Sequence, residues 1–583
     1  MMPMQGPTNL TIRRRDVAIP GTWPEAVHPV LRRIYAARGI TDPGQVSHRL
    51  AGLLSPRSMG GLETAASVLA DAMAGDQRIC VVGDFDADGA TGTALAVRGL
   101  RLLGARQVSY KVPHRLRHGY GLSPALVADL GHPRPDLILT VDNGVTSVDG
   151  VAAAADAGIR VVITDHHLPG NRLPDAAAIV NPNLPGDGFP SKALAGVGVM
   201  FYLLLSLRTH LRARGALDAR AEPDLSELLD LVALGTVADL VPLDHNNRIL
   251  VAAGLRRLRA GRAQPGLRAL MQVAGRDPAR MVSADLGFAL GPRLNAAGRL
   301  EDMALGIECL LADDEQRALA LARQLDAINH ERRALQEDML EQVETHVARC
   351  LAAVESGREA DAALCVFEPD WHPGVIGLVA SRLKERLHRP VIAFAPGGED
   401  GLLRGSARSI PGFHLRDALA DVASGNPGLV ERFGGHAMAA GLSLAPAKLA
   451  AFRAEFLALA AERLSPEALQ AELWSDGALA GEDFSRELAE QLRWGGPWGQ
   501  GFSAPVFDDV FELLQWRVVG NGHLKLELQH QTSGRRLPAI QFGGYDGQPP
   551  APRLHLAYQL ETDDYRDRRD IQLLVRHRVA LSR

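Results

Sequence analysis

The sequence predicts an α/β protein with a doubly wound parallel sheet, a long connecting helix, a second α/β domain and a C-terminal β-barrel. Between residues 78 and 180, short apolar runs alternate with helical segments, as strands and helices alternate around a parallel sheet. Residues 313–356 are charged and contain neither Gly nor Pro, which predicts a helix that bridges two domains. Residues 523–529 and 554–560 alternate between apolar and polar side chains, as half-buried antiparallel strands do.

The first domain is expected at residues 76–312, after a helical lead-in at residues 1–75. Its elements are expected in this order: strand 79–84, helix 92–103, strand 107–112, helix 123–130, strand 137–141, helix 147–157, strand 161–164 and strand 178–180. Residues 196–270 are expected to be mainly helical. A sheet of this kind binds its ligands at the carboxyl ends of its strands.

The second half of the chain is expected to begin with the connecting helix, 313–356. A coiled-coil arm for dimerisation is the alternative for this segment, but it has no sustained heptad. A second α/β domain is expected at 357–465, beginning with strand 363–367 and helix 375–387. Residues 466–583 are expected to hold a linker and a small β-barrel.

Composition narrows the class of protein. The 583 residues carry a net charge of −5, so any polyanion must be held by local basic patches. The four cysteines, Cys80, Cys309, Cys350 and Cys365, form no Cys-x-x-Cys pair, which argues against a zinc ribbon and for reduced thiols. The longest apolar run, 197–207, is too short to span a bilayer. We therefore expect a cytoplasmic protein without a membrane partner.

Carboxylates and imidazoles follow three of the expected strands. Because the carboxyl ends of these strands share one edge, their side chains would repel each other unless a cation lay between them. The candidate ligands are Asp84, Asp86, Asp88, Asp142, His166 and His167, and Asp239 after an apolar helix adds another. Oxygen and imidazole donors without thiolate suit Mn²⁺ or Mg²⁺. The number of ligands fits two ions that share a bridging carboxylate, as in phosphoryl hydrolysis.

Each of these residues also has a simpler interpretation. Asp84, Asp86 and Asp88 resemble the start of an EF-hand calcium loop, but an apolar strand precedes them and no glutamate follows at the twelfth position. Asp142 alone could cap a helix. His166 and His167 could be structural histidines. The shared sheet edge is what favours a metal site over these alternatives.

Several motifs together resemble the DHH phosphoesterase superfamily, and within it the exonucleases specific to single strands. The resemblance covers nearly the whole chain. Its motifs are Gly83-Asp84-Phe85-Asp86-Ala87-Asp88-Gly89, Val112-Pro113-His114-Arg115, Gly119-Tyr120-Gly121-Leu122, Asp142-Asn143-Gly144, Thr164-Asp165-His166-His167, Gly235-Thr236-Val237-Ala238-Asp239, Pro292-Arg293-Leu294-Asn295-Ala296-Ala297-Gly298-Arg299, Trp371-His372-Pro373-Gly374, Gly405-Ser406-Ala407-Arg408-Ser409 and Gly434-Gly435-His436.

The resemblance implies a DHH domain, a DHH-associated domain and an OB-like barrel that binds single strands. It implies that Asp86, Asp88, Asp142, His166, His167 and Asp239 hold two Mn²⁺ or Mg²⁺ ions, with Asp142 bridging. Asp84 would be an outer ligand, and Asp165 would orient a histidine. Arg115, Ser406 and Arg408 would contact a terminal 5′ phosphate, with His436 beside the scissile phosphate. Further substrate contacts would be Arg293, Asn295, Arg299, Gly434 and Gly435.

The function implied is 5′→3′ degradation of single-stranded DNA to mononucleotides in repair and recombination, by a monomer. A single-strand-binding protein and a recombination helicase are the partners that the resemblance implies. The alternatives are a DHH phosphoesterase for small molecules or oligonucleotides, and a catalytically inactive DNA-binding scaffold. Arg293 and Arg299 could be ordinary surface cations, although their Gly, Pro and Asn neighbours predict a loop near a ligand. Trp494, Trp498 and Trp516 could stack bases or belong to the core.

Overall fold

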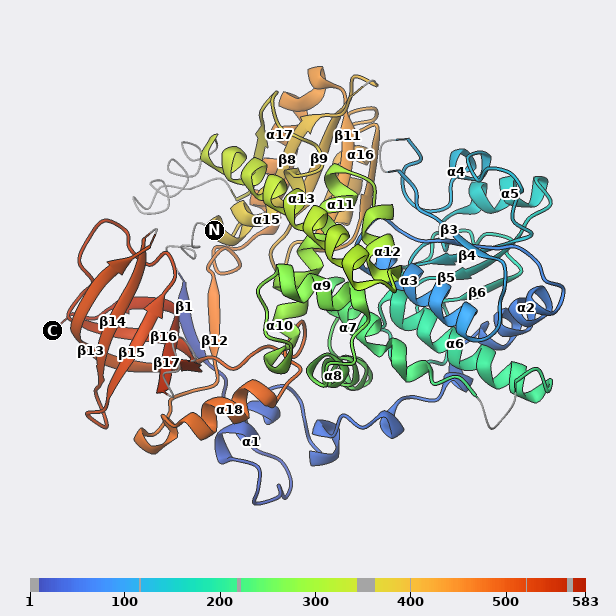
Figure 1. Cartoon of the computed structure of the whole chain (residues 1–583). Coiled ribbons are helices and arrows are strands. Elements are labelled where there is room, and N and C mark those ends of the chain that lie inside the picture. Colours follow the sequence, from blue (N-terminus) through green and yellow to red (C-terminus); the bar gives the residue numbers. More distant parts are fainter. Residues whose placement is uncertain are drawn as a thin grey trace.

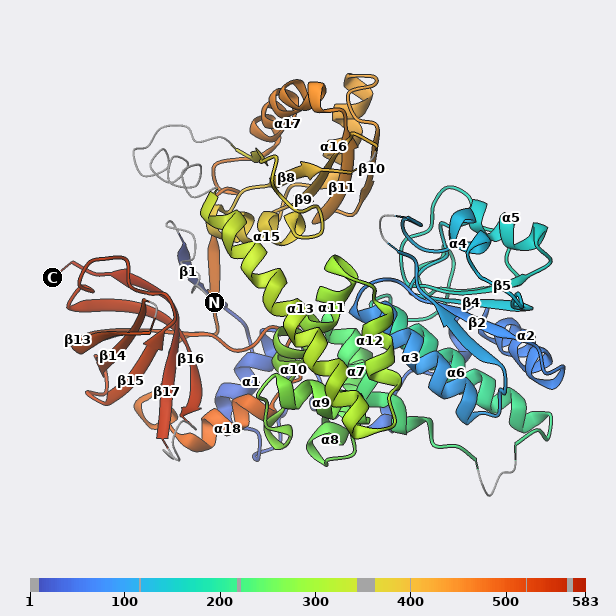
Figure 2. The same ribbon diagram turned by 45° about the horizontal axis from the view of Figure 1, so that its top comes forward.

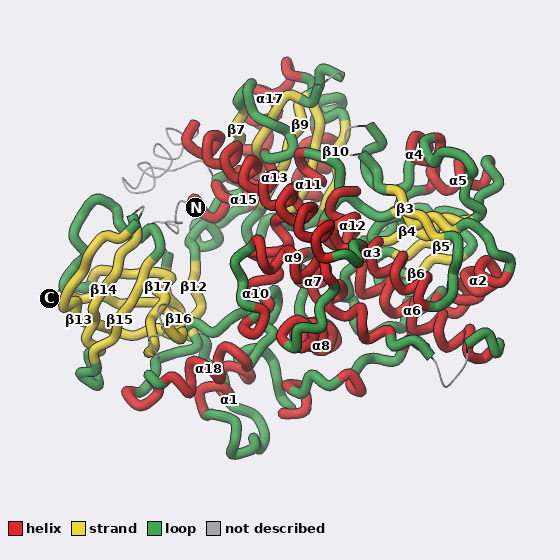
Figure 3. The backbone as a smooth tube through the Cα atoms, viewed as in Figure 1, coloured by secondary structure: helices red, strands yellow, loops and turns green. Residues whose placement is uncertain are grey.

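The computed structural model describes residues 10–114, 117–217, 222–342, 362–398, 400–520, 522–563 and 570–582 (Figure 1). Its strands gather in three main groups, with the helical body between them (Figure 3). The predicted architecture is confirmed: a domain with a parallel sheet, a long helix, a second α/β domain and a closed C-terminal barrel. Residues 343–356 of the expected connecting helix lie outside the described residues. Among the described helices, none is both long and apolar enough to cross a membrane.

The sheet of the first domain has the order β3-β2-β4-β5-β6, with every pair parallel. Its strands and flanking helices are α2 (Leu62–Ala74), β2 (Ile79–Val82), α3 (Ala87–Leu102), β3 (Val108–Lys111), α4 (Pro124–Ala128), β4 (Leu137–Val141), α5 (Val148–Asp156), β5 (Arg160–Thr164), β6 (Ala178–Val180) and α6 (Gly196–Ala213). The order reverses between β2 and β4. A crevice for ligands forms at such a switch point, beyond the strand ends.

Both faces of the sheet are buried, which explains why its strands are almost continuously apolar. Val81 and Leu139 pack with α2, α3 and α6 in one core. Cys80, Val82 and Ile138, which point to the other face, pack with α4 and α5 in a second core. The strand and helix positions predicted from the sequence are thus confirmed, with differences of a few residues at the ends. Helix α3 begins earlier than expected because Asp86 caps it.

A helical body connects the two α/β domains. It consists of α7 (Leu229–Ala238), α8 (His245–Arg259), α9 (Pro265–Val273), α10 (Ser283–Asp285), α11 (Gly291–Leu300), α12 (Ala304–Leu311) and α13 (Glu315–Gln342). The loop expected at residues 292–299 is wrong, since this segment forms most of α11. Proline is compatible with the first turn of a helix, where no intrahelical donor is lost, so Pro292 does not prevent it. Helix α13 runs from this body up to the second domain (Figure 2).

The second α/β domain has the sheet order β10-β11-β9-β8-β7. Its elements are β7 (Leu364–Phe367), α15 (Ile376–Leu387), β8 (Val391–Pro396), β9 (Leu403–Arg408), α16 (Leu415–Gly425), β10 (Arg432–Gly435), β11 (Ala439–Leu444) and α17 (Leu449–Arg463). Helices α16 and α17 contribute to one core of this domain, and α15 contributes to another. The domain therefore has its own apolar cores on both faces of its sheet.

The C-terminal part is a closed barrel with the order β13-β14-β15-β17-β16. Its strands are β13 (Phe507–Val519), β14 (His523–His530), β15 (Arg536–Gln541), β16 (Arg553–Asp563) and β17 (Asp570–Ala580), and α18 (Arg486–Trp494) precedes them. The predicted alternation is confirmed in β14, where Leu524, Leu526 and Leu528 are buried. Trp498 stacks with Tyr35 and with Phe502, as part of an aromatic cluster. Trp494 and Trp516 are 40% and 38% exposed, so the core interpretation is wrong for these two.

The N-terminal segment joins this barrel to the rest of the protein. Strand β1 (Thr11–Arg14) pairs in parallel with β12 (Glu472–Ser475), beside the barrel in Figure 1. Helix α1 (Pro29–Ala36) follows. The Arg14 guanidinium bonds both carboxylate oxygens of Asp508 in β13, at 2.9–3.1 Å. Strand β1 therefore contributes to holding the barrel in place through Arg14.

Candidate metal centre and substrate cleft

The three aspartates after β2 are fixed by the start of helix α3. Asp86 is the N-cap of that helix, and its Oδ1 accepts a hydrogen bond from the Gly89 N–H at 2.9 Å. Oδ1 of Asp84 accepts one from the Phe85 N–H at 2.8 Å. A Cβ at position 89 would lie 2.5 Å from the backbone oxygen of Asp84, so only glycine permits this close turn. The motif thus places its carboxylates directly beyond the strand.

Asp142 occupies the strained position that follows β4. Its φ of 64° lies in the left-handed region, which few residues other than glycine adopt. A Cβ added at Gly196, where α6 begins, would lie only 2.5 Å from the Cβ of Asp142. The surrounding structure therefore determines the place of this carboxylate, and backbone strain of this kind is concentrated at functional sites.

The two histidines that follow β5 are held in place by hydrogen bonds to the carboxylate of Asp165. Oδ1 of Asp165 accepts hydrogen bonds from the backbone N–H groups of His166 and His167 and lies 2.8 Å from Nδ1 of His167. Its Oδ2 accepts a bond from the N–H of Val145. Burial alone would lower the pKa of His167, but the hydrogen bond and charge of Asp165 raise it. Asp165 therefore fixes the direction in which this imidazole points.

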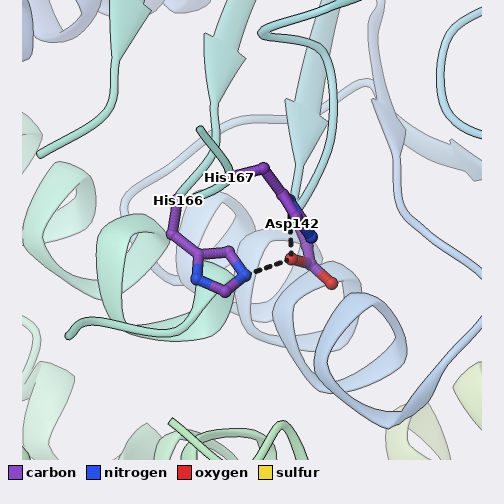
Figure 4. A group of neighbouring side chains, drawn as sticks. All are labelled: Asp142, His166 and His167. Carbon is purple, nitrogen blue, oxygen red and sulfur yellow. Dashed lines mark ion pairs between the residues drawn. The ribbon is translucent and has the colours of Figure 1, made fainter. Parts of the chain in front are cut away.

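These side chains converge on one point (Figure 4). Nε2 of His166 lies 3.1 Å from Oδ1 of Asp142, 3.5 Å from Oδ2 of Asp239 and 4.0 Å from Oδ2 of Asp88. Nδ1 of His167 lies 3.9 Å from Oδ1 of Asp142. In the part of the chain that the structure describes, three groups of side chains have the geometry to hold a metal ion: Asp142, His166 and His167; Asp88, His166 and Asp239; and Asp84, Asp86 and Asp142. Asp142 and His166 each belong to two of them.

The chemistry of this cluster fits divalent cations. Among the described residues, Oδ1 of Asp142, Nε2 of His166 and Oδ2 of Asp239 have no hydrogen-bond partner, although all three are buried. Burial and the charge of Asp88 raise the pKa of Asp142 well above its ordinary value, and burial with Asp88 does the same for Asp239. Burial lowers the pKa of His166 to about 4. A bound cation would favour the neutral form of this imidazole and the ionised form of these closely spaced carboxylates.

Asp88 has a second role in the fold. Its Oδ2 accepts a hydrogen bond from the N–H of Gly196 at 2.6 Å, and its Oδ1 accepts one from the N–H of Val197 at 3.0 Å. The carboxylate therefore lies at the N-terminus of α6, where the helix dipole favours negative charge. Burial and the charge of Asp86 nevertheless raise the pKa of Asp88 to about 7. The Asp88 carboxylate therefore fixes the start of α6 beside the cluster. Each of its oxygens accepts one hydrogen bond there and has a further lone pair that could bind a metal.

The second domain reaches this cluster through His436. Its ring stacks nearly parallel to that of His167, with the centroids 6.3 Å apart. Burial and the charge of His167 lower the pKa of His436. His436 follows β10, where Gly435 has a φ of 136° and a Cβ would lie 2.5 Å from the Ala439 oxygen. Space is open beside Gly434, since nothing lies within 4 Å of a Cβ built there. The cluster is thus faced by both domains.

Tyr120 is a neighbour of the cluster for which the sequence indicated no chemistry. Its hydroxyl donates to the backbone oxygen of Asp142 at 3.2 Å and lies 3.3 Å from Nδ1 of His167. Its ring meets those of Phe85 and His167 edge to face. The only signal in the sequence was its place between Gly119 and Gly121 in one of the motifs.

Ser406 and Arg408 belong to a hydrogen-bonded polar cluster in the second domain. Arg408 donates to Oγ of Ser406 at 3.2 Å and to Oγ of Ser381 in α15 at 3.1 Å. A Cβ at Gly377, in the first turn of α15, would lie 2.9 Å from Oγ of Ser406. Burial lowers the pKa of the Arg408 guanidinium. The expected third contributor, Arg115, lies outside the described residues.

Helix α11 places the other predicted substrate contacts. Arg293 is buried and donates to Oδ1 of Asp326 in α13 at 2.8 Å, so it is not a surface cation. Asn295 accepts a hydrogen bond from the N–H of Ala87 through Oδ1 and thereby supports the first motif. Arg299 donates to the oxygen of Gly374 in the second domain at 3.4 Å. Contact of these three residues with a substrate stays a prediction.

The fold and the cluster define a protein of the DHH phosphoesterase class, as the motifs predicted. Residues 78–236 match the DHH family N-terminal domain, residues 360–462 the DHHA1 domain and residues 475–577 the RecJ OB domain. The chain is 51% identical to the single-stranded-DNA-specific exonuclease RecJ of Dickeya dadantii, over 97% of this chain and 98% of that protein. The chain belongs to the RecJ family.

Two solved structures of RecJ from Thermus thermophilus are similar to this one. The complex with Mn²⁺ aligns with a TM-score of 0.79 at 30% identity and covers 98% of this chain and 80% of its own. The complex with Mg²⁺ aligns with a TM-score of 0.73 at 28% identity, over 98% and 79%. Both ions belong to the type that the donor set of this chain predicts.

Proposed function

We propose that this protein is a single-stranded-DNA-specific exonuclease that hydrolyses phosphodiester bonds from the 5′ end and releases 5′-mononucleotides. Its membership of the RecJ family supports the activity, because relatives that match almost the whole chain carry that name. The observation that carries the proposal is the stacking of His436 on His167 at 6.3 Å, which brings both α/β domains to one carboxylate cluster. A strand end bound between the domains would lie against that cluster.

Two divalent ions, Mn²⁺ or Mg²⁺, would be held by this cluster. Asp84, Asp86, Asp88, Asp142, His166, His167 and Asp239 would supply the ligands. Asp142 would be shared, since it belongs to two of the three groups and, unlike the imidazole of His166, offers two oxygens. When bound, such ions provide a hydroxide from water at neutral pH and neutralise charge on the phosphate. These roles need carboxylates that are ionised, which the bound charge favours.

The protein's own residues would orient the reacting groups. Asp165 fixes the ring of His167 through the 2.8 Å contact with Nδ1. His436 has a pKa lowered by burial and by His167, so it is neutral near pH 7 and can donate one hydrogen bond to the scissile phosphate. The Tyr120 ring, which meets the His167 ring edge to face, would help to hold that imidazole in place.

The polarity of the reaction would come from the second domain. A terminal phosphate carries more charge than an internal one, and Arg408 with Ser406 offers it charge-assisted hydrogen bonds at the start of α15. Arg115 of the DHH domain would complete this pocket. A 5′ phosphate held there would place the first phosphodiester bond at a fixed distance from the cluster.

The decisive experiment is digestion of end-labelled single-stranded DNA with Mn²⁺, with product size resolved over time. We expect mononucleotides from the 5′ end, slower reaction of 5′-hydroxyl ends, and no cutting of circular single strands. Hydrolysis of dinucleotides alone would favour the small-molecule phosphoesterase, and binding without hydrolysis would favour the inactive scaffold. Comparable attack from 3′ ends would contradict the assigned polarity.

We place this activity in the cytoplasm, in DNA repair and recombination. A monomer would suffice, since both domains that face the cluster belong to one chain. A single-strand-binding protein and a recombination helicase are the proposed partners, because both present the single strands that the enzyme would degrade. Affinity capture with each purified partner, and light scattering of the free protein, test these assignments.

A further inference from the structure

The buried face of α13 is apolar in its first half and polar in the section that follows. Buried residues recur every three or four positions, as expected for a helix packed along one side. Ala318, Ala322 and Leu325 contribute to the core of the first domain, and Met339 to that of the second. Between them, the same face carries Asn329, Arg332 and Gln336, which are only 0%, 9% and 8% exposed. A helix that merely bridged two apolar cores would have no need of this polar section.

The polar groups in this section lack partners. Among the described residues, neither amide atom of Asn329 has a hydrogen-bond partner, and Nε of Arg332 has none either. Buried polar groups are nearly always paired, so each exception requires an explanation. Three donors and acceptors in adjacent turns indicate a site for a polar ligand.

The charge around Arg332 gives the sign of that ligand. Burial and the positive charges of Arg333 and Arg382 lower the pKa of Arg332 to about 10. No ion pair joins Arg332 to a carboxylate within the described part of the chain. The contrast with Arg293 is direct, because Asp326 of the same helix α13 neutralises that buried guanidinium at 2.8 Å. Three arginines without a carboxylate between them would attract an anion.

The section lies at the junction of the two domains. Helix α13 packs against α11, whose Arg299 bonds Gly374, and against α15. Helix α15 supplies Arg382, and the residue before it, Ser381, accepts a hydrogen bond from Arg408. In Figure 2, α13 passes from the helical body to α15 along this junction. An anion bound at Arg332 would therefore be held between the first domain and the pocket of Arg408.

We propose that Asn329 and Arg332 form a second anion site, which binds an internal phosphodiester of the single strand while Arg408 holds its end. The inference rests on the proposed function. Asn329 would donate its amide N–H to one phosphate oxygen, and Arg332 would pair with the charge. The site would thus contribute to affinity along the strand without touching the reacting atoms.

Two substitutions separate this role from a structural one. Arg332→Met removes an unpaired buried charge at similar length, so we expect an unchanged or higher melting temperature of the free protein. Its affinity for an unlabelled 12-nucleotide strand in EDTA should fall about 10- to 100-fold, with a salt slope about one unit smaller. Asn329→Asp places a carboxylate three residues before Arg332, where the two can pair. It should raise the melting temperature and weaken DNA binding.

A matched control is available on the same helix. Arg317 is exposed and pairs with Glu308, so Arg317→Gln removes the same charge without affecting the proposed site. We expect its affinity for the strand to stay within about twofold of the original, after allowance for general electrostatics. Loss of stability in both Arg332→Met and Asn329→Asp, with DNA affinity unchanged, would show a structural role and overturn the proposal.

Strands with one neutral methylphosphonate linkage identify the phosphate. For the original protein, a methylphosphonate at one position near the 5′ end should weaken binding. For Arg332→Met, a methylphosphonate at that position should have no effect, while those at other positions should act as they do on the original protein. Coupling of Arg332 to the terminal 5′ phosphate, or to no position, would overturn the assignment to an internal phosphodiester. If the original protein neither binds nor degrades single strands, the proposed function fails. If it does both and Arg332→Met equals it, only this inference fails.

Discussion

Replacement of Gly196 by alanine should inactivate the metal centre although it substitutes none of the proposed ligands. A Cβ at this position would lie 2.5 Å from Cβ and 2.8 Å from Oδ1 of Asp142, and 2.8 Å from its Cα. Ordinary contacts of a Cβ begin near 3.4 Å, so the aspartate or the helix must move by about 1 Å in this densely packed site. Asp142 cannot rotate away freely, because its backbone is already in the left-handed region.

The size of the effect follows from that displacement. A misplacement of about 1 Å at a catalytic group can cost roughly 100-fold in rate. Overpacking should also lower the free energy of unfolding by about 1–3 kcal/mol. The assay is kcat/KM on 5′-labelled single-stranded DNA with Mn²⁺, together with thermal unfolding and the metal content of the purified protein. We expect a large loss of rate, a lower metal content and a modest loss of stability.

Gly198→Ala is the matched control, two residues further along α6. The nearest atom to its Cβ is Cδ2 of Leu194 at 3.1 Å, the far end of a flexible side chain that can move. Since alanine favours helix over glycine by about 1 kcal/mol, this variant should retain both rate and stability. If Gly196→Ala retains a rate within about threefold of the original, less than 1 kcal/mol in the barrier, the close packing on Asp142 is not needed for function.

Three further predictions follow from other parts of the structure. Asp142→Ala should abolish hydrolysis and reduce bound metal, while circular dichroism shows an intact fold; activity within a few-fold at unchanged metal content would remove Asp142 from the site. Arg408→Ala should reduce the rate and also the preference for 5′-phosphorylated over 5′-hydroxyl strands; an unchanged preference would place the terminal phosphate elsewhere. Burial raises the pKa of Asp508, but hydrogen bonds from His555, Arg14 and Ser475 hold this pKa below its ordinary value of 3.8. The ionised carboxylate therefore stabilises the folded protein above that pH, and this contribution is lost as the pH falls below it. Asp508→Asn should therefore cost about 1–3 kcal/mol at pH 7, and thermal unfolding should show this difference shrinking below about pH 4, whereas a constant difference would exclude the carboxylate charge as its cause.

The sheet and its edge were predictable because they depend on short segments. Apolar runs that are buried on both faces mark each strand, and the residue after each run lies at the strand end by necessity. The positions of Asp142 and His166, as candidate ligands at the sheet edge, could therefore be inferred without tertiary information. The barrel was predictable for the same reason, from the alternation in 523–529.

Contacts between distant segments were not predictable in this way. The stacking of His436 on His167 depends on how two domains pack, which no local pattern contains. Helix α11 was mistaken for a loop because Gly291 and Pro292 dominate its start, and burial of Leu294 and Ala297 overrides that local preference. The domain borders expected at residues 76, 313, 357 and 466 stay predictions.

The second domain connects its two proposed substrate contacts through one residue. Ala439 of β11 pairs with Arg408 of β9, and its backbone oxygen accepts the N–H of His436 at 2.8 Å. The pocket for the terminal phosphate and the histidine at the cluster are therefore held at a fixed separation by adjacent backbone segments. With this fixed separation, the distance from the bound 5′ phosphate at Arg408 to the phosphate at His436 would be the same in every cycle. The domain cannot move one of these two contacts without moving the other. Under the proposed function, this is the physical reason to expect products of one uniform size.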